Sequence, residues 1–199
     1  MAGVLGLLIF LFVLVGVVGF LVAGIYNQLV AKRRLYQNAY SQIDVQLRRR
    51  HDLIPNLVES VKGYMKHERE TLEAVIAARN VAMQATQRAA GAPGDPRAMQ
   101  QLSEAEGMLT GVLGRLFAVA EAYPDLKADR SMGQLMEELR TTENQIAFAR
   151  QAFNDAVMRY NTAREVFPNN IIAGGFNFSE AQFLEEASPE VKEVPRVSF

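Results

Sequence analysis

The chain has 199 residues, with 21 lysines and arginines against 22 acidic residues, and this length suits one domain together with a membrane anchor. A nucleic-acid-binding module needs a concentrated basic face, so a net charge of −1 argues against nucleic acid as a partner. The chain contains no cysteine, which excludes disulfides, thiolate metal sites and thiol nucleophiles.

The first 25 residues carry no charge and are dominated by Leu, Val, Ile, Phe and Gly. A membrane-spanning helix needs roughly 20 apolar residues, which residues 4–25 supply. Tyr26 and Asn27 follow, and then the cluster Lys32, Arg33 and Arg34, as expected at a membrane interface. A cleaved signal peptide would carry Lys or Arg before a shorter apolar run. We therefore predict a retained single-span anchor with its interface over residues 1–30.

Two further expectations concern this anchor. Positive charge lies on its C-terminal side, and the positive-inside rule then favours a cytoplasmic over a periplasmic location for the rest of the chain. Gly16, Gly19 and Ala23 share one helix face, and small residues at such spacing allow helices to pack closely in lipid. Self-association through this face is one interpretation, and the general abundance of glycine in membrane spans is the other.

After residue 30, apolar residues recur at alternating spacings of four and three, which is typical of helices packed in a bundle. The first stripe comprises Tyr36, Tyr40, Ile43, Leu47, Arg50, Ile54, Leu57, Val61 and Tyr64; a weaker second one comprises Leu72, Ile76, Arg79, Met83 and Thr86. The third comprises Leu102, Ala105, Leu109, Val112, Leu116, Val119 and Tyr123. The fourth comprises Met132, Leu135, Leu139, Thr142, Ile146, Ala149, Phe153, Ala156, Tyr160, Ala163 and Phe167. The predicted fold is all-α: an N-terminal transmembrane helix followed by an elongated antiparallel up-down-up-down four-helix bundle over residues 31–168.

Helix-breaking residues divide these stripes. A loop is predicted at 91–96, which reads Gly-Ala-Pro-Gly-Asp-Pro. The third helix should end at Tyr123-Pro124, the fourth at Pro168, and the first somewhere within 63–68. Pro55 lies inside the first helix and should kink it, because it removes the hydrogen bond to the carbonyl of His51.

Residues 169–199 are expected to form an apolar membrane-proximal segment and an extended tail. An up-down-up-down order returns the fourth helix to the membrane, where the chain is uncharged from Phe167 to Phe178. Such a stretch is too short to span. We expect its apolar residues to contact the headgroup region or a neighbouring subunit: Phe167, Ile171, Ile172, Phe176 and Phe178. The alternative is that they cap the open base of the bundle.

Several charged residues are predicted to form a structural polar network. Arg50 lies on an apolar stripe and should pair with a carboxylate from Glu104, Glu106 or Glu143, setting the register between helices. Arg79 is interpreted in the same way. Asp44, Arg48 and Asp52 are spaced for pairing along one helix face. The alternative for this group is a solvated charged face.

No residue pattern predicts catalysis. The two histidines, His51 and His67, lack the Glu-x-x-His spacing of a di-iron bundle and the second histidine of a zinc metalloprotease. We therefore expect no enzyme activity, no cofactor, no metal and no catalytic residue.

The residues themselves resemble the LemA family. The similarity runs through SQIDVQLRRRHDLIPNLV (41–58), Ala78-Arg79-Asn80, YPDLKA (123–128), FNDAV (153–157), FPNNIIA (167–173) and the terminal VPRVSF (194–199). It covers nearly the whole chain after the anchor. Gly174-Gly175 departs from the family pattern, and the short tail after it follows the pattern more loosely.

This resemblance implies a bacterial, single-span helical-bundle protein of the inner membrane without an established enzymatic activity. One branch of the family is associated with building magnetosome membranes, which suggests a self-associating scaffold that organises or shapes the bilayer. Others are linked to membrane proteases and envelope quality control, which suggests an adaptor for a protease or an envelope-stress signalling partner. The expected partners are the lipid bilayer, further copies of the chain and, for the adaptor, a membrane protease or other envelope protein.

Overall fold

The computed structural model describes residues 2–65, 67–124, 126 and 129–186. Its helices are α1 (Ala2–Lys62), α2 (Arg69–Gly91), α3 (Pro96–Ala120), α5 (Arg130–Glu165) and α6 (Asn169–Gly175). No strand occurs among the residues it describes. The predicted all-α class is confirmed.

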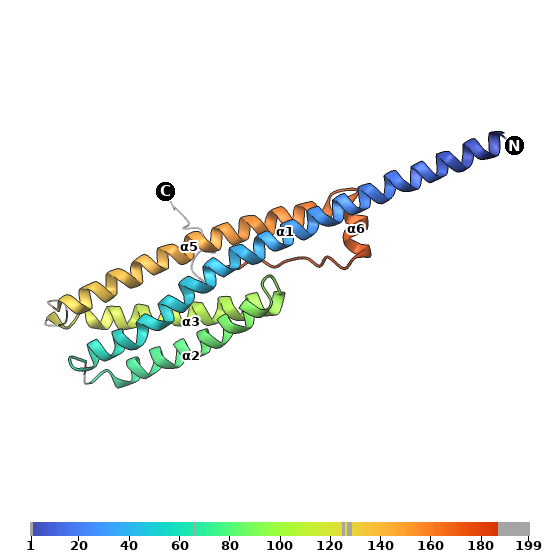
Figure 1. Ribbon diagram of the computed structural model, residues 1–199. Helices are drawn as coiled ribbons and strands as arrows, with labels where there is room; N and C mark the ends of the chain where they lie inside the picture. The colour runs from blue at the N-terminus through green and yellow to red at the C-terminus, as the bar shows by residue number, and fades with distance from the viewer. Residues whose placement is uncertain (1, 66, 125, 127–128, 187–199) are drawn as a thin grey trace, which may run out of the picture.

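The four long helices form an elongated bundle (Figure 1). α1 packs along α5, α2 packs along α3, and α1 also contacts α2. Successive long helices run in opposite directions, so the antiparallel order expected from the stripes is confirmed. The N-terminal part of α1 projects beyond the bundle, and α6 lies where α1 leaves it (Figure 1).

α1 is a single helix of 61 residues, which corresponds to about 90 Å of helix. The helix runs through residue 30 without a break, since residues 26–35 contain neither Pro nor Gly, and Leu29 is already fully buried in the bundle core. The apolar segment and the first helix of the bundle are therefore one continuous element. Pro55 lies within this helix, which continues beyond it to Lys62.

The predicted stripes form most of the core. All of the first stripe is buried up to Val61, but Tyr64 is exposed because α1 ends at Lys62, and Met65 is buried instead. On α2 the prediction of Met83 is wrong: this side chain is exposed. The residues of α2 that enter the core are mostly small, which lets α2 and α3 approach closely: Leu72, Val75, Ala82, Ala85, Thr86 and Ala89.

Aromatic rings join α1 to α5. Tyr36 lies 5.2 Å from Tyr160 and 6.2 Å from Phe153, measured between ring centroids. Tyr40 lies 5.7 Å from Phe153 in an edge-to-face arrangement, a favoured geometry for aromatic pairs. These contacts lock the register between the two longest helices.

Side-chain caps set where two helices begin. The Asp95 carboxylate accepts a hydrogen bond of 2.9 Å from the amide of Ala98, and Pro96 occupies the first turn of α3. Asp129 caps α5 through the amide of Ser131 at 2.8 Å. Both are the N-terminal signals that helices prefer. The loop predicted at 91–96 is present but shorter, because Gly91 ends α2 and Pro96 begins α3.

The chain after α6 is part of the bundle. After a turn at 176–177, residues 178–186 form an extended segment, here called the strap, whose side chains Phe178, Ala181 and Leu184 are buried. Together with α6 and this turn, the strap accounts for the described part of 169–199. The remainder of that segment lies outside the described residues.

Two asparagines of α5 hold the strap. The Asn161 side chain donates to the carbonyl of Ala181 at 2.8 Å and accepts from its amide at 3.0 Å. Asn154 makes the same pair of bonds with Leu184, at 3.1 and 2.9 Å. Seven residues of helix rise about 10.5 Å and three extended residues span about 10 Å, so the two spacings match and the strap runs along α5.

The strap also contacts the other helical pair. The amide of Gln182 donates to the carbonyl of Gly94 at 2.8 Å, and Ser103 of α3 donates to the carbonyl of Glu185 at 2.9 Å. Gly94 has φ +85°, and a β-carbon there would lie 3.1 Å from Ala181. Glycine suits this turn because it accepts a positive φ and leaves room for the strap.

Candidate functional site

The N-terminal part of α1 is a candidate membrane anchor. Within α1 an 18-residue window reaches a mean hydropathy of 3.1 with none of it buried in the molecule. The side chains from Val4 to Leu21 point outward on every side of the helix. A helix that is apolar all round and has no protein packed against it suits lipid rather than water. By length and composition, this helix indicates a single-pass membrane protein.

Gly16, Gly19 and Ala23 are exposed on this helix. A β-carbon added at Gly16 or Gly19 would meet nothing within 4 Å. The small face is therefore open to another helix, as required for close packing in lipid.

The cationic cluster that follows the anchor is only partly exposed to solvent. The Arg33 guanidinium lies 5.0 Å from the centre of the Phe178 ring, a cation–π contact that ties the strap to α1. The Arg34 side chain donates to Gln37 at 3.3 Å and remains exposed. Lys32 is half-buried. Consecutive residues are about 100° apart around a helix, so the three cations point in different directions.

The predicted membrane-proximal residues separate into two groups. Phe167, Ile171 and Phe176 are exposed, at 78%, 63% and 54%; we call these three residues the foot. Ile172 is half-buried. Phe178 is only 4% exposed, so for this residue the alternative applies and its ring closes the base of the bundle.

Aromatic contacts set the level of the foot. Tyr26 directly follows the apolar segment. Its ring centroid lies 5.1 Å from that of Phe176 and 5.4 Å from that of Phe178, and both pairs are edge to face. The foot therefore lies on the bundle at the height where the candidate membrane segment ends.

A buried polar cluster lies deeper in the bundle, around Arg50. This side chain is 2% exposed and forms ion pairs with Glu106 of α3 and Glu143 of α5. It also donates to the hydroxyl of Thr110 at 3.3 Å. The pairing expected for Arg50 thus involves two of its three candidate partners at once, and Glu104 stays outside.

Glu106 is the centre of this cluster. His51 lies 2.9 Å from one carboxylate oxygen of Glu106, and the Thr86 hydroxyl donates to the same oxygen at 3.3 Å. Burial acts to raise the Glu106 pKa, but the hydrogen bond from His51 and the charge of Arg50 outweigh it and hold the pKa below its usual value. The cluster joins α1, α2, α3 and α5, which suits a structural role.

Arg79 differs from the prediction, because its strong partner is not a carboxylate. Its Nε donates at 2.6 Å to the main-chain carbonyl of His51. This is the carbonyl that loses its helical hydrogen bond to Pro55. Arg79 therefore supplies from α2 the donor that the proline removes from α1.

The remaining charged residues of the predicted network, Asp44, Arg48 and Asp52, do not belong to the buried cluster around Arg50. Arg48 pairs with Asp44 at 2.9 Å while its own side chain stays 59% exposed. Asp52 is exposed, and for it no ion pair is recorded within the described ranges. In that part of the chain no group of three His, Cys, Asp or Glu side chains is placed to hold a metal ion.

Sequence reasoning missed the parts played by His51, Thr86, Asn154 and Asn161. A signal existed for the asparagines. They stand seven residues apart, and the strap carries apolar residues three apart. Because the strap is extended, its spacing of three can be matched to the spacing of seven on α5 only once the strap is known to pack against that helix.

A model of the LemA family matches residues 39–199, which is most of the chain. The chain belongs to the LemA family. It is 26% identical over 179 residues to "Magnetosome protein MamQ" of Magnetospirillum gryphiswaldense, which covers 81% of this chain and 65% of the relative. "Magnetosome protein MamQ 1" of Paramagnetospirillum magneticum matches to the same extent. "Protein LemA" of Metamycoplasma hominis is 25% identical over 166 residues, 83% of this chain and 71% of the relative.

These matches confirm the resemblance drawn from the sequence. This LemA protein spans just under two thirds of the MamQ relatives, 65% of their length. The matched region contains the Arg50 cluster, α6 and the strap. The similarity to these relatives indicates that the chain is a membrane-associated member of the family.

Proposed function

We propose that this LemA protein is a non-enzymatic, membrane-anchored scaffold that self-associates and organises or shapes the bilayer. The observation that carries the proposal is the foot. Three large apolar side chains stand exposed on or next to α6, and one of them, Phe176, contacts Tyr26 at the end of the candidate membrane segment. Apolar side chains exposed at this level are stabilised by entering the boundary between headgroups and acyl chains.

The continuity of α1 gives the foot a mechanical role. The helix that enters the lipid is the same helix that carries the bundle core, and α6 contacts it directly. A wedge of apolar side chains in one leaflet, held at a fixed angle to a rigid anchor, displaces lipid on one side only. Many copies side by side then favour curvature.

Self-association would use the small face of the anchor. Gly16, Gly19 and Ala23 allow two α1 helices to approach closely in lipid, and both glycines are open in the monomer. The cations Lys32, Arg33 and Arg34 favour a cytoplasmic bundle at the bacterial inner membrane. The name of the MamQ relatives, magnetosome proteins, supports a role at a membrane.

The experiment reconstitutes the full-length protein alone into liposomes and images them by electron microscopy, with oligomer size measured by crosslinking in the bilayer. Regular oligomers and reshaped vesicles support the scaffold. The adaptor for a membrane protease or envelope-stress partner predicts unchanged vesicles and a monomer.

Matched variants separate the two surfaces. Replacing Phe167 and Phe176 with Ser should abolish reshaping but leave oligomers intact. Gly16→Leu with Gly19→Leu should reduce the oligomers. Phe148→Ser is the control for the foot, because Phe148 is equally exposed at 73% on α5 but lies about 25 Å from its membrane end. Gly24→Leu is the control for the anchor, since Gly24 lies about 100° around the helix from Ala23. Equal effects of test and control variants would contradict the proposal.

A further inference from the structure

The seam between α3 and α5 is filled by the strap over only part of its length. The strap is held by Asn161 and Asn154 of α5 and by Ser103 of α3. The last described contact is an ion pair of 3.1 Å between Glu186 and Arg150. Further from the membrane, α3 and α5 continue side by side (Figure 1).

The space beyond the strap is an open groove that begins where the strap ends. A cleft of about 260 Å³ is lined by Glu185, Glu186, Thr110 and Glu143. Thr110 and Glu143 also line the next cavity, of about 520 Å³. The two cavities are therefore consecutive parts of one groove that leads from Glu186 to the far end of the bundle.

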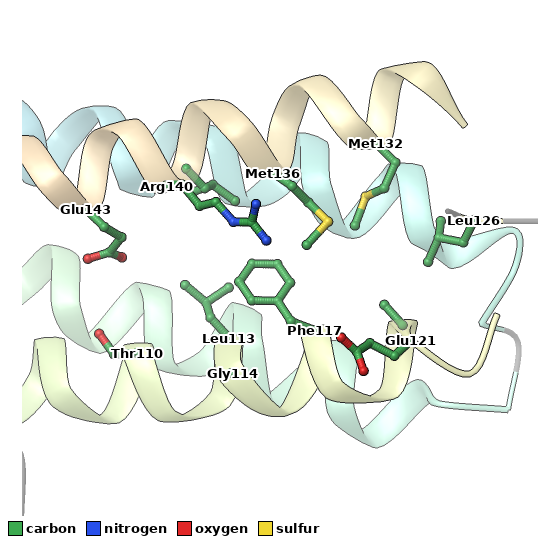
Figure 2. A pocket seen from close by; sticks show the side chains of 12 residues that line it. Thr110, Leu113, Gly114, Phe117, Glu121, Leu126, Met132, Met136, Arg140 and Glu143 are labelled. Carbon is green, nitrogen blue, oxygen red and sulfur yellow. The ribbon is translucent and has the colours of Figure 1, made fainter. Parts of the chain in front are cut away.

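The larger cavity is apolar. Figure 2 shows Phe117 rising from α3 toward Met136 of α5, with Met132 and Leu113 beside them. Exposing such side chains to water is unfavourable, and methionines adapt readily to an apolar partner. Arg140 lies at the rim, and no ion pair is recorded for it across the described part of the chain. The groove thus suits an extended segment with spaced apolar residues and a carboxylate.

The chain itself continues for 13 residues after Glu186. Val191, Val194 and Val197 are spaced by three, as the buried strap residues Phe178, Ala181 and Leu184 are, and they are shifted by one position relative to that series. The hydrogen-bonded pairs Ala181–Asn161 and Leu184–Asn154 show that three residues along the strap correspond to seven residues back along α5. The same register places residue 190 beside residue 140. Residue 190 is a glutamate, and residue 140 is the arginine of the rim.

We propose that residues 187–199 bind in the α3–α5 groove of the same molecule, with Val191 and Val194 against the apolar floor and Glu190 beside Arg140. The length is sufficient. From Asn154 to Met132 α5 rises about 33 Å, and 13 extended residues reach about 43 Å. The tail thereby completes the seam that the strap begins.

The absence of cysteine makes a direct test possible. In the full-length protein in liposomes, Met136→Cys is combined with Val191→Cys and oxidised mildly. The expected result is an intrachain disulfide, detected by mass spectrometry, in several-fold higher yield than for Gln134→Cys with Val191→Cys. Gln134 is exposed on the same helix, about 160° around from Met136. Equal yields would overturn the proposal, and so would a predominance of interchain disulfides, which would assign the groove to a neighbouring copy.

A charge exchange provides the second measurement. Arg140→Glu should lower the disulfide yield several-fold, and adding Glu190→Arg should restore it. A yield that Arg140→Glu leaves unchanged, or that the second exchange does not restore, would contradict the register. Neither measurement depends on how the protein acts on the bilayer, so this inference and the proposed function can fail separately.

Discussion

At the scale of single residues, the Arg50 cluster explains why charged groups occupy the core of this bundle. A buried arginine is tolerated because two carboxylates compensate its charge, and Glu106 also takes hydrogen bonds from His51 and Thr86. Such a cluster specifies register more than it stabilises the fold. Removing Arg50 leaves Glu106, whose side chain is only 14% exposed, without the cation of its ion pair.

Arg50→Ala should therefore destabilise the protein strongly. It strands Glu106 in the core, and breaking a buried pair costs about 3–5 kcal/mol. Arg69→Ala is the control, because Arg69 and its partner Glu73 are both exposed and surface changes stay within about 0.5 kcal/mol. Thermal unfolding followed by circular dichroism measures both. Equal melting temperatures for the two variants would show that Arg50 is solvated.

The acid sensitivity of the bundle should depend on Glu106. Its folded-state pKa lies below the ordinary value of 4.5, so its contribution to stability is complete above that value and is lost as the pH falls through the lower folded pKa. Glu106→Gln should be less stable than the parent at pH 7, and the difference should narrow below about pH 4.5. Denaturant titrations across this range measure it. A difference independent of pH would be inconsistent with the shift.

Arg79 and Pro55 should be energetically coupled. Arg79→Met removes the donor to the His51 carbonyl, at a cost of about 1–3 kcal/mol for an unsatisfied buried group. Pro55→Ala restores a main-chain N–H that can bond this carbonyl. In the Pro55→Ala background, Arg79→Met should cost distinctly less. A double-mutant cycle of unfolding free energies measures the coupling, and additive effects would refute it.

At the scale of elements, the strap substitutes for helix–helix contact between α3 and α5. It is extended, yet its backbone groups find partners on α5, α3 and the loop at Gly94. Buried amides and carbonyls need such partners. The backbone groups of a helix are already paired with one another, so the two asparagine side chains supply the donors and acceptors that bind the backbone of the strap.

Asn161→Ala should loosen the strap locally. The substitution removes both hydrogen bonds to Ala181 and leaves two buried backbone groups unsatisfied. Each unsatisfied group lowers the stability by about 1–3 kcal/mol. Amide hydrogen exchange at Ala181 and Leu184 should accelerate, while exchange in α1 stays unchanged. Gln151→Ala, an exposed change on α5, is the control. Unaltered exchange at both amides would mean that the asparagine does not hold the strap.

At the scale of the whole molecule, the anchor and the bundle are continuous in chain but separate in packing. No residue from Val4 to Leu21 is buried, whereas Leu29 and the following stripe form the core. The bundle therefore has the contacts it needs without the apolar segment. The foot and Tyr26 stay with the bundle when the chain is cut after Ile25.

Deletion of residues 1–25 should leave a soluble, helical protein that unfolds cooperatively, because the four long helices bury one another. Thermal unfolding by circular dichroism checks this. The truncated protein should still bind liposomes weakly through the foot, and adding Phe167→Ser with Phe176→Ser should abolish that binding at unchanged helicity. Loss of cooperative unfolding on deletion would show that the anchor is part of the fold.

The candidate anchor, the four helices and the place of Arg50 could be predicted from the amino-acid sequence, because each depends on local periodicity and on which residue types water or lipid accepts. Tertiary structure decided what periodicity cannot encode. It made α1 continuous across residue 30, gave Arg79 to a carbonyl rather than a carboxylate, and separated buried Phe178 from exposed Phe176. The strap is the clearest case: an extended segment has no helical period, so its place follows only from the partners that α5 and Gly94 offer it.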